Sequence, residues 1–96
     1  MDGLVTDDVQ SASETALPEA VVYWRPGCPF CSMLRVGLAR QGIAYREVNI
    51  WEDPEAAAFV RSVARGNETV PTVTVGSVSL VNPSAGEVAD LMAAGN

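Results

Sequence analysis

The chain lacks histidine and lysine altogether and holds only two cysteines in 96 residues. Without histidine, any catalysis has to use thiols or carboxylates, and the two thiols are the stronger candidates. The six basic residues are all arginines, against twelve acids, so the net charge is −6. Binding to a nucleic-acid backbone needs a basic stripe, which this balance does not supply. We therefore expect no nucleic-acid partner.

Long apolar runs are also missing, since none approaches the roughly 20 residues of a membrane span. The first residues lack the positive start and the apolar stretch of a secretory signal. We therefore expect a cytoplasmic protein without a membrane partner. In that compartment a Cys-x-x-Cys pair is more often redox-active or metal-binding than a structural disulfide.

The N-terminal part differs in composition from the rest. Five of the twelve acids lie within the first 19 residues, which contain no basic residue. Residues 1–18 show no sustained hydrophobic period, as is typical of segments without a packed core. We expect 1–18 to be a flexible acidic extension and 19–96 to form one small domain, monomeric in solution.

The hydrophobic pattern of this domain predicts seven elements in the order β-α-β-α-β-β-α. The expected elements are strand 20–24, helix 29–41, strand 43–50, a helix from Pro54 that Gly66 ends, hairpin 70–81, and a helix capped by Ser84 that Gly95 can end. A strand, helix and strand of these lengths favour a parallel crossover, whereas the hairpin adds antiparallel strands. The predicted fold is α/β, with a four-stranded mixed sheet covered by helices on both faces.

The spacing within helix 29–41 predicts which side is buried. Apolar or small residues recur at i, i+3, i+4, i+7 and i+8, a helical period. They are Phe30, Met33, Leu34, Gly37 and Leu38. Because glycine costs about 1 kcal/mol relative to alanine inside a helix, we expect Gly37 to allow close packing against a strand.

Local signals predict turns and caps in the second half. Gly76-Ser77 fits a two-residue type II′ turn, which pairs Val75 with Val78 and sets the register of hairpin 70–81. Asp53 before Pro54 is expected to cap one helix, and 84–87 reads as a capping box for the last one.

Cys28 and Cys31 lie one helical turn apart, at the junction of strand 20–24 and helix 29–41. Unpaired backbone N–H groups and the helix dipole favour a thiolate at that junction, so Cys28 is the predicted nucleophile. Cys31 lies deeper in the helix and is the predicted resolving thiol. Arg25 either adds positive potential or is an exposed surface arginine.

Three other interpretations of the cysteine pair stay open. A structural disulfide would close a very small loop, which gives little stabilisation. A zinc ion needs four ligands, and this pair supplies only half a site, so we expect no metal. The cysteines can also be two ordinary core residues, although the neighbouring Pro and Gly argue against this.

Pro71 follows Val70 at the start of the predicted hairpin. Cis bonds are uncommon even before proline. In the predicted topology, however, this loop falls beside the start of helix 29–41, and we expect the Val70-Pro71 bond to be cis.

Three blocks of the sequence together resemble the glutaredoxin family of the thioredoxin fold, and most closely the actinobacterial mycoredoxins. The blocks are 28–31 (Cys-Pro-Phe-Cys), 69–73 (Thr-Val-Pro-Thr-Val) and 82–85 (Asn-Pro-Ser-Ala). The resemblance spans about residues 20–92. It implies a thiol–disulfide oxidoreductase that reduces mixed disulfides between client proteins and a small thiol, with no bound cofactor.

The resemblance also implies where the substrate binds. The backbone of Val70 before Pro71 would hold the disulfide, and the loop around Asn82 and Ser84 would contact the rest of the small thiol. The predicted substrate-binding residues are Arg25, Phe30, Val70, Pro71, Asn82 and Ser84.

The loop 81–84 (Val-Asn-Pro-Ser) bears on the choice of small thiol. Glutathione-using glutaredoxins usually carry a Gly-Gly turn there, so mycothiol is the expected reducing co-substrate. Electron-donor redoxins served by NADPH and thioredoxin reductase usually carry Trp-Ser-Gly-Phe, which is missing, but they remain an alternative. A third alternative is a non-enzymatic iron–sulfur carrier or binding module.

Overall fold

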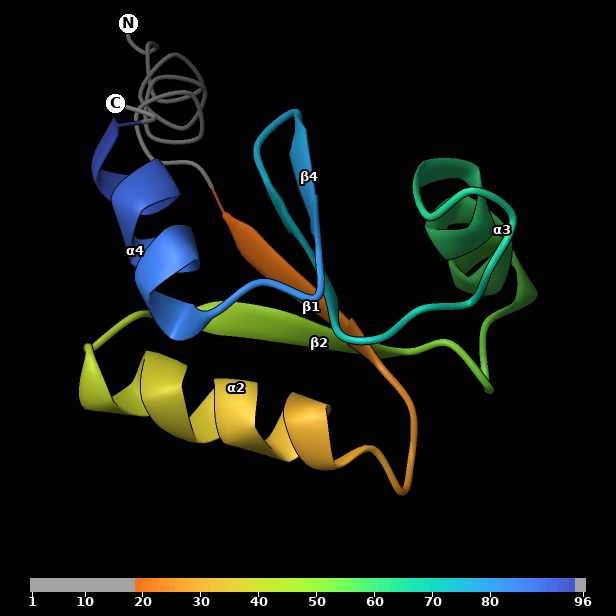
Figure 1. Cartoon of the computed structure of the whole chain (residues 1–96), viewed down its shortest axis with the longest axis horizontal. Coiled ribbons are helices and arrows are strands. Elements are labelled where there is room, and N and C mark those ends of the chain that lie inside the picture. Colours follow the sequence, from red (N-terminus) through yellow and green to blue (C-terminus); the bar gives the residue numbers. More distant parts are fainter. Residues whose placement is uncertain (1–18, 95–96) are drawn as a thin grey trace, which may run out of the picture.

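The computed structural model describes residues 19–94. Its elements follow the predicted β-α-β-α-β-β-α order (Figure 1). They are β1 (Ala20–Trp24), α2 (Pro29–Arg40), β2 (Tyr45–Asn49), α3 (Pro54–Val63), β3 (Thr72–Val75), β4 (Val78–Val81) and α4 (Ala85–Ala94). The acidic extension predicted for 1–18 and the predicted stop at Gly95 lie outside the described residues.

The four strands form one mixed sheet in the order β2-β1-β3-β4. β1 pairs with β2 in parallel, whereas β1 with β3 and β3 with β4 are antiparallel. The crossover through α2 and the hairpin β3–β4 were both predicted, so the sheet confirms the expected α/β architecture.

The two faces of the sheet carry separate hydrophobic clusters. Figure 1 shows α2 and α4 on one side of the sheet and α3 on the other. On one face Val22 and Val73 pack against residues of α2 and α4, including Leu34, Leu38 and Val88. On the other face, residues of α3 pack with Ile50, Tyr23 and Val48. Alternation along β1 explains the division, because successive side chains of a strand point to opposite faces.

Caps and turns define the ends of the elements as predicted. The Asp53 carboxylate accepts the Glu55 and Ala56 backbone N–H groups at 3.1 Å each. The Ser84 hydroxyl accepts the Glu87 N–H at 3.1 Å, and the Glu87 carboxylate accepts the Ser84 N–H at 2.8 Å, which completes the capping box.

The hairpin register is also confirmed, since Val75 pairs with Val78 and Val73 with Leu80. Gly76 has φ +59°, and Ser77 is not among the residues with positive φ, as a type II′ turn requires.

The second strand begins two residues later than expected. Gly42 has φ +70° and donates to the Ala39 carbonyl, while the Ile43 N–H donates to the Leu38 carbonyl. This pair of bonds is a Schellman motif that ends α2, so 42–44 belong to the turn and β2 starts at Tyr45.

The predicted buried side of α2 was partly wrong. Leu34 and Leu38 are buried, but Phe30 is 60% and Met33 67% exposed, and Cys31 takes a buried position instead. Gly37 does permit a close approach, but to α4 rather than to a strand, because α2 and α4 share one face of the sheet. A Cβ at Gly37 would lie 2.7 Å from the Ala85 Cβ.

Within residues 19–94, no helix combines the length and the apolar character needed to cross a membrane.

The contact between α2 and α4 predicts the effect of Gly37→Ala. Overpacking costs about 1–3 kcal/mol, against the roughly 1 kcal/mol that alanine adds as a helix former. We expect the free energy of unfolding, measured in urea, to fall by up to about 2 kcal/mol. Gly86→Ala is the matched control, since its Cβ would meet only the Ser84 hydroxyl at 3.8 Å. Equal stability of the two variants would contradict the account.

Candidate active site

Cys28 lies between β1 and α2, directly before the first residue of the helix. The chain turns through Pro26 and Gly27, which has φ +75°, and Cys28 then adopts the extended backbone of an N-cap residue. Pro29 follows at the first helical position, where its missing N–H costs nothing. The thiol is therefore the side chain that caps the helix.

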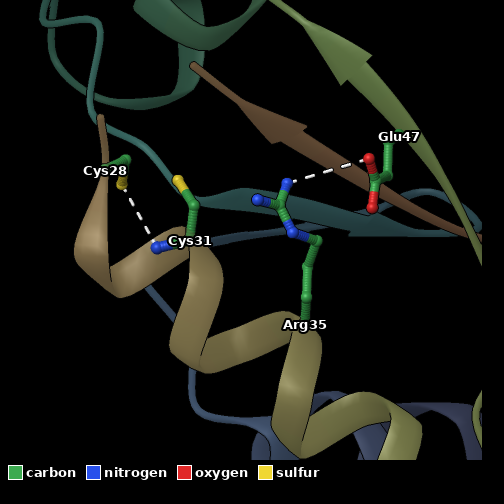
Figure 2. Close-up of polar contacts among 4 residues, drawn as sticks. All are labelled: Cys28, Cys31, Arg35 and Glu47. Carbon is green, nitrogen blue, oxygen red and sulfur yellow. Dashed lines mark hydrogen bonds and ion pairs between the residues drawn. The ribbon is translucent and has the colours of Figure 1, made fainter. Parts of the chain in front are cut away.

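The Cys28 sulfur makes two polar contacts. It accepts the Cys31 backbone N–H at 3.2 Å (Figure 2). The thiol also reaches the Val70 carbonyl oxygen at 3.8 Å, across 42 residues of sequence. Cys28 is 6% exposed, so it is buried but, unlike Cys31, not completely. The N–H contact and the helix dipole both stabilise negative charge on this sulfur, as a nucleophile requires.

Cys31 has a different environment although it is only one turn away. It is fully buried, and both cysteines are free thiols. Burial, followed by the hydrogen bond with Cys28, raises the pKa of Cys31, whereas the Arg25 backbone and the Arg35 charge lower it; together they bring it to about 11. Cys31 is thus the less exposed thiol of the pair, as predicted.

The loop before β3 lies against this helix start. The Val70-Pro71 bond is cis, as predicted. The Pro71 carbonyl accepts the Asn82 N–H at 2.7 Å, and Asn82 has φ +53°. This bond ties the proline loop to the β4–α4 loop, so the two predicted substrate-binding segments are held together.

A pocket of about 300 Å³ opens between α2 and the β4–α4 loop. Its lining is mostly apolar and consists of Phe30, Met33, Leu34, Asn82, Pro83, Ser84 and Ala85. Three of the predicted binding residues, Phe30, Asn82 and Ser84, therefore share one cavity. The sequence did not single out Met33 and Pro83 for this role, although each lies within or next to a predicted segment.

Arg25 lies apart from this pocket. Its guanidinium is 5.8 Å from the centre of the Trp51 ring and donates to the Pro26 carbonyl at 3.3 Å. Only its backbone bears on the cysteines, through a hydrogen bond that lowers the pKa of Cys31. A role for its side chain in substrate binding stays a prediction.

Arg35 is the residue that the sequence interpretation missed. Its guanidinium lies 4.7 Å from the centre of the Trp24 ring and 3.7 Å from the Glu47 carboxylate (Figure 2). The available signal was its position four residues after Cys31, which places both side chains on one side of α2. Among residues 19–94, no group of three His, Cys, Asp or Glu side chains could hold a metal ion.

Comparison with known proteins agrees with this geometry. The glutaredoxin family model matches residues 20–80. The chain belongs to the glutaredoxin family. A glutaredoxin-family protein of Mycobacterium tuberculosis is 47% identical over 68 residues, covering 70% of this chain and 81% of that protein.

One further sequence relative and one solved structure are also similar to this chain. Mycoredoxin 1 of Corynebacterium glutamicum is 36% identical over 73 residues, covering 75% of this chain and 90% of that protein. The solution structure of a Brucella melitensis glutaredoxin superimposes with a TM-score of 0.66 at 27% identity, covering 83% and 94% of the two chains. The fold is therefore the thioredoxin-like glutaredoxin fold, as predicted.

The different burial of the two thiols predicts selective alkylation. With iodoacetamide at pH 7, the reduced protein should take one adduct, on Cys28, because only the thiolate reacts and the pKa of Cys31 is about 11. Cys31 should become reactive only as the pH approaches that value or when the protein is unfolded. Peptide mapping by mass spectrometry reads both sites. Equal labelling of Cys31 in the folded protein at pH 7 would contradict the assignment.

Proposed function

We propose that this glutaredoxin is a thiol–disulfide oxidoreductase that reduces mixed disulfides between client proteins and a small thiol, with Cys28 as the nucleophile. The observation that carries the proposal is the Cys28 sulfur, which caps α2 and accepts the Cys31 N–H at 3.2 Å. That position supports an attacking thiolate without a histidine base, and the chain contains no histidine.

The proposed reaction has two steps. The Cys28 thiolate attacks the sulfur of the small thiol in the mixed disulfide, and the client leaves as a thiolate that takes up a proton. The small thiol is then bound to Cys28 through a new disulfide. A second small-thiol molecule then attacks the sulfur of the bound small thiol, which forms the small-thiol disulfide and frees the Cys28 thiolate. Alternatively, Cys31 attacks the Cys28 sulfur, which releases the small thiol and forms a Cys28–Cys31 disulfide.

The surroundings of Cys28 support this order of events. The Val70 carbonyl lies 3.8 Å from the sulfur, so a disulfide at Cys28 would run along the backbone before Pro71. The remainder of the small thiol would then occupy the pocket of about 300 Å³ beside Phe30 and the β4–α4 loop. A volume of that size suits a small molecule.

We propose mycothiol as the small thiol. The similarity to Mycoredoxin 1 supports this choice, as does the loop Asn82-Pro83-Ser84 in place of a Gly-Gly turn. Mycothiol would act as a reducing co-substrate, and the protein itself would hold no cofactor.

Substitution of each cysteine tests the proposed roles. Cys28→Ser should abolish reduction of a client–mycothiol mixed disulfide, because no other thiol can start the attack. Cys31→Ser should retain this activity, since a second small thiol can complete the cycle. The rates are measured with mycothiol and its reductase, following NADPH consumption. Persistent turnover in Cys28→Ser would refute the assignment.

The position of Phe30 in the pocket predicts that its side chain contributes to substrate binding. Phe30→Ala should raise KM for the mixed disulfide about three- to tenfold, because an apolar wall worth roughly 0.7–1.4 kcal/mol is lost. Val36→Ala is the matched control, since Val36 is exposed on the same helix but does not line the pocket. An equal KM for the two variants would place the small thiol elsewhere.

A further inference from the structure

Arg35 brings a positive charge to the side of α2 that carries the resolving thiol. It follows Cys31 by four residues, so the two side chains are neighbours on the helix surface. Figure 2 shows the guanidinium and the Cys31 sulfur extending from the same side of α2, with Glu47 beyond the guanidinium. Neither residue belongs to the lining of the pocket.

The guanidinium is held in place from two directions. The Trp24 ring of β1 lies 4.7 Å from it, a cation–π distance, and the Glu47 carboxylate of β2 lies 3.7 Å away. The Arg35 side chain is 27% exposed, so solvent screens its charge less than that of a freely exposed arginine. A fixed, partly buried cation can act on a nearby thiol where a mobile surface cation would not.

Several groups act on the Cys31 thiol from the elements around it. Burial, the hydrogen bond with Cys28 and the Cys28 charge raise its pKa, whereas the Arg25 backbone and the Arg35 charge lower it. From β2, the Glu47 carboxylate pairs with Arg35, and the Arg35 charge also acts on the Tyr45 phenol. Burial raises the pKa of Tyr45, as does Glu47, so this phenol stays neutral around pH 7.

This balance changes once Cys28 has reacted. In the mixed disulfide the Cys28 sulfur carries no charge and no proton, so its electrostatic effect on Cys31 is lost. Burial then still opposes ionisation of Cys31, and the Arg25 backbone and the Arg35 guanidinium still favour it. The cation therefore matters most in the state in which Cys31 has to attack.

We infer that Arg35 is a positioning residue for the resolving step: its guanidinium, held by Trp24 and Glu47, stabilises the Cys31 thiolate that attacks the Cys28 sulfur. In this step Cys31 loses its proton to solvent, the Cys28–Cys31 disulfide forms, and the bond between Cys28 and the small thiol breaks. The small thiol leaves as a thiolate and takes up a proton. The inference rests on the proposed function, because it concerns the second half of the same reaction.

The direction of the effect follows from the acidity of Cys31. Removing the cation raises the pKa of Cys31, so less thiolate is present at pH 7. A more basic thiolate is also a better nucleophile. This gain in reactivity cancels only about 0.4–0.5 of the decrease in the logarithm of the rate that the smaller thiolate fraction causes. A partly exposed charge interaction changes the thiolate fraction by roughly two- to fivefold, so after this offset the resolving step slows by roughly 1.5- to 2.5-fold.

A chromogenic aromatic disulfide that releases thionitrobenzoate separates the two steps. Mixed in stopped flow with the reduced full chain, it should give two phases of colour, the first from attack by Cys28 and the second from displacement by Cys31. Arg35→Gln should leave the first phase unchanged, slow the second roughly 1.5- to 2.5-fold at pH 7 and move its pH profile to higher pH. Arg35→Lys should restore most of the rate, because it keeps the charge.

Two controls separate charge from structure. Arg40→Gln makes the same substitution near the exposed end of α2 and should change neither phase. Glu47→Gln breaks the ion pair but leaves the cation, so its second phase should be at least as fast as that of the native protein. Equal slowing in Glu47→Gln and Arg35→Gln, or an unchanged second phase in Arg35→Gln, would overturn the inference.

Failure of the proposed function would look different. A first phase that persists in Cys28→Ser would refute Cys28 as the nucleophile, whatever Arg35 does. Loss of the first phase in Cys28→Ser together with an unchanged second phase in Arg35→Gln would refute only the role of Arg35.

Discussion

The hydrogen bond from the Cys31 backbone N–H to the Cys28 sulfur connects the fold to the chemistry. Because this sulfur caps α2, the first turn of the helix and the reactive atom are positioned by one contact. The sheet then brings the Val70 carbonyl to 3.8 Å from the same sulfur. The β4–α4 loop is attached to the segment 70–71 in turn, because the Asn82 N–H donates to the Pro71 carbonyl. Hydrogen bonds thus link three segments that are distant in sequence, and two of these segments contact the Cys28 sulfur directly.

Packing makes the two thiols unequal. Cys28 precedes the helix and keeps a small exposed area, whereas Cys31 points into the protein and is fully buried. Burial stabilises the neutral form of Cys31, and in the proposed mechanism Cys28 therefore attacks first and Cys31 attacks only in the second step. The Arg35 guanidinium moderates this inequality without removing it.

Local signals were enough to predict much of the fold. The Gly76-Ser77 turn fixed the hairpin register, and the capping box from Ser84 fixed the start of α4, because both depend on neighbouring residues alone. The sequence pattern failed for Phe30, which fits the apolar period of α2 but is 60% exposed and lines the pocket beside the β4–α4 loop. The role of Arg35 could not be predicted, since Trp24 and Glu47 meet it only through tertiary packing.

The most direct test of the account is to identify the adduct that Cys31→Ser retains after exposure to oxidised mycothiol or, separately, oxidised glutathione. In this variant no second thiol can remove the small molecule, so peptide mapping by mass spectrometry shows which sulfur was attacked and by which disulfide. We predict an adduct on Cys28 that forms faster with mycothiol. Labelling of Cys31 in the reciprocal Cys28→Ser variant at the same rate, or no adduct on Cys28 with either disulfide, would contradict the account.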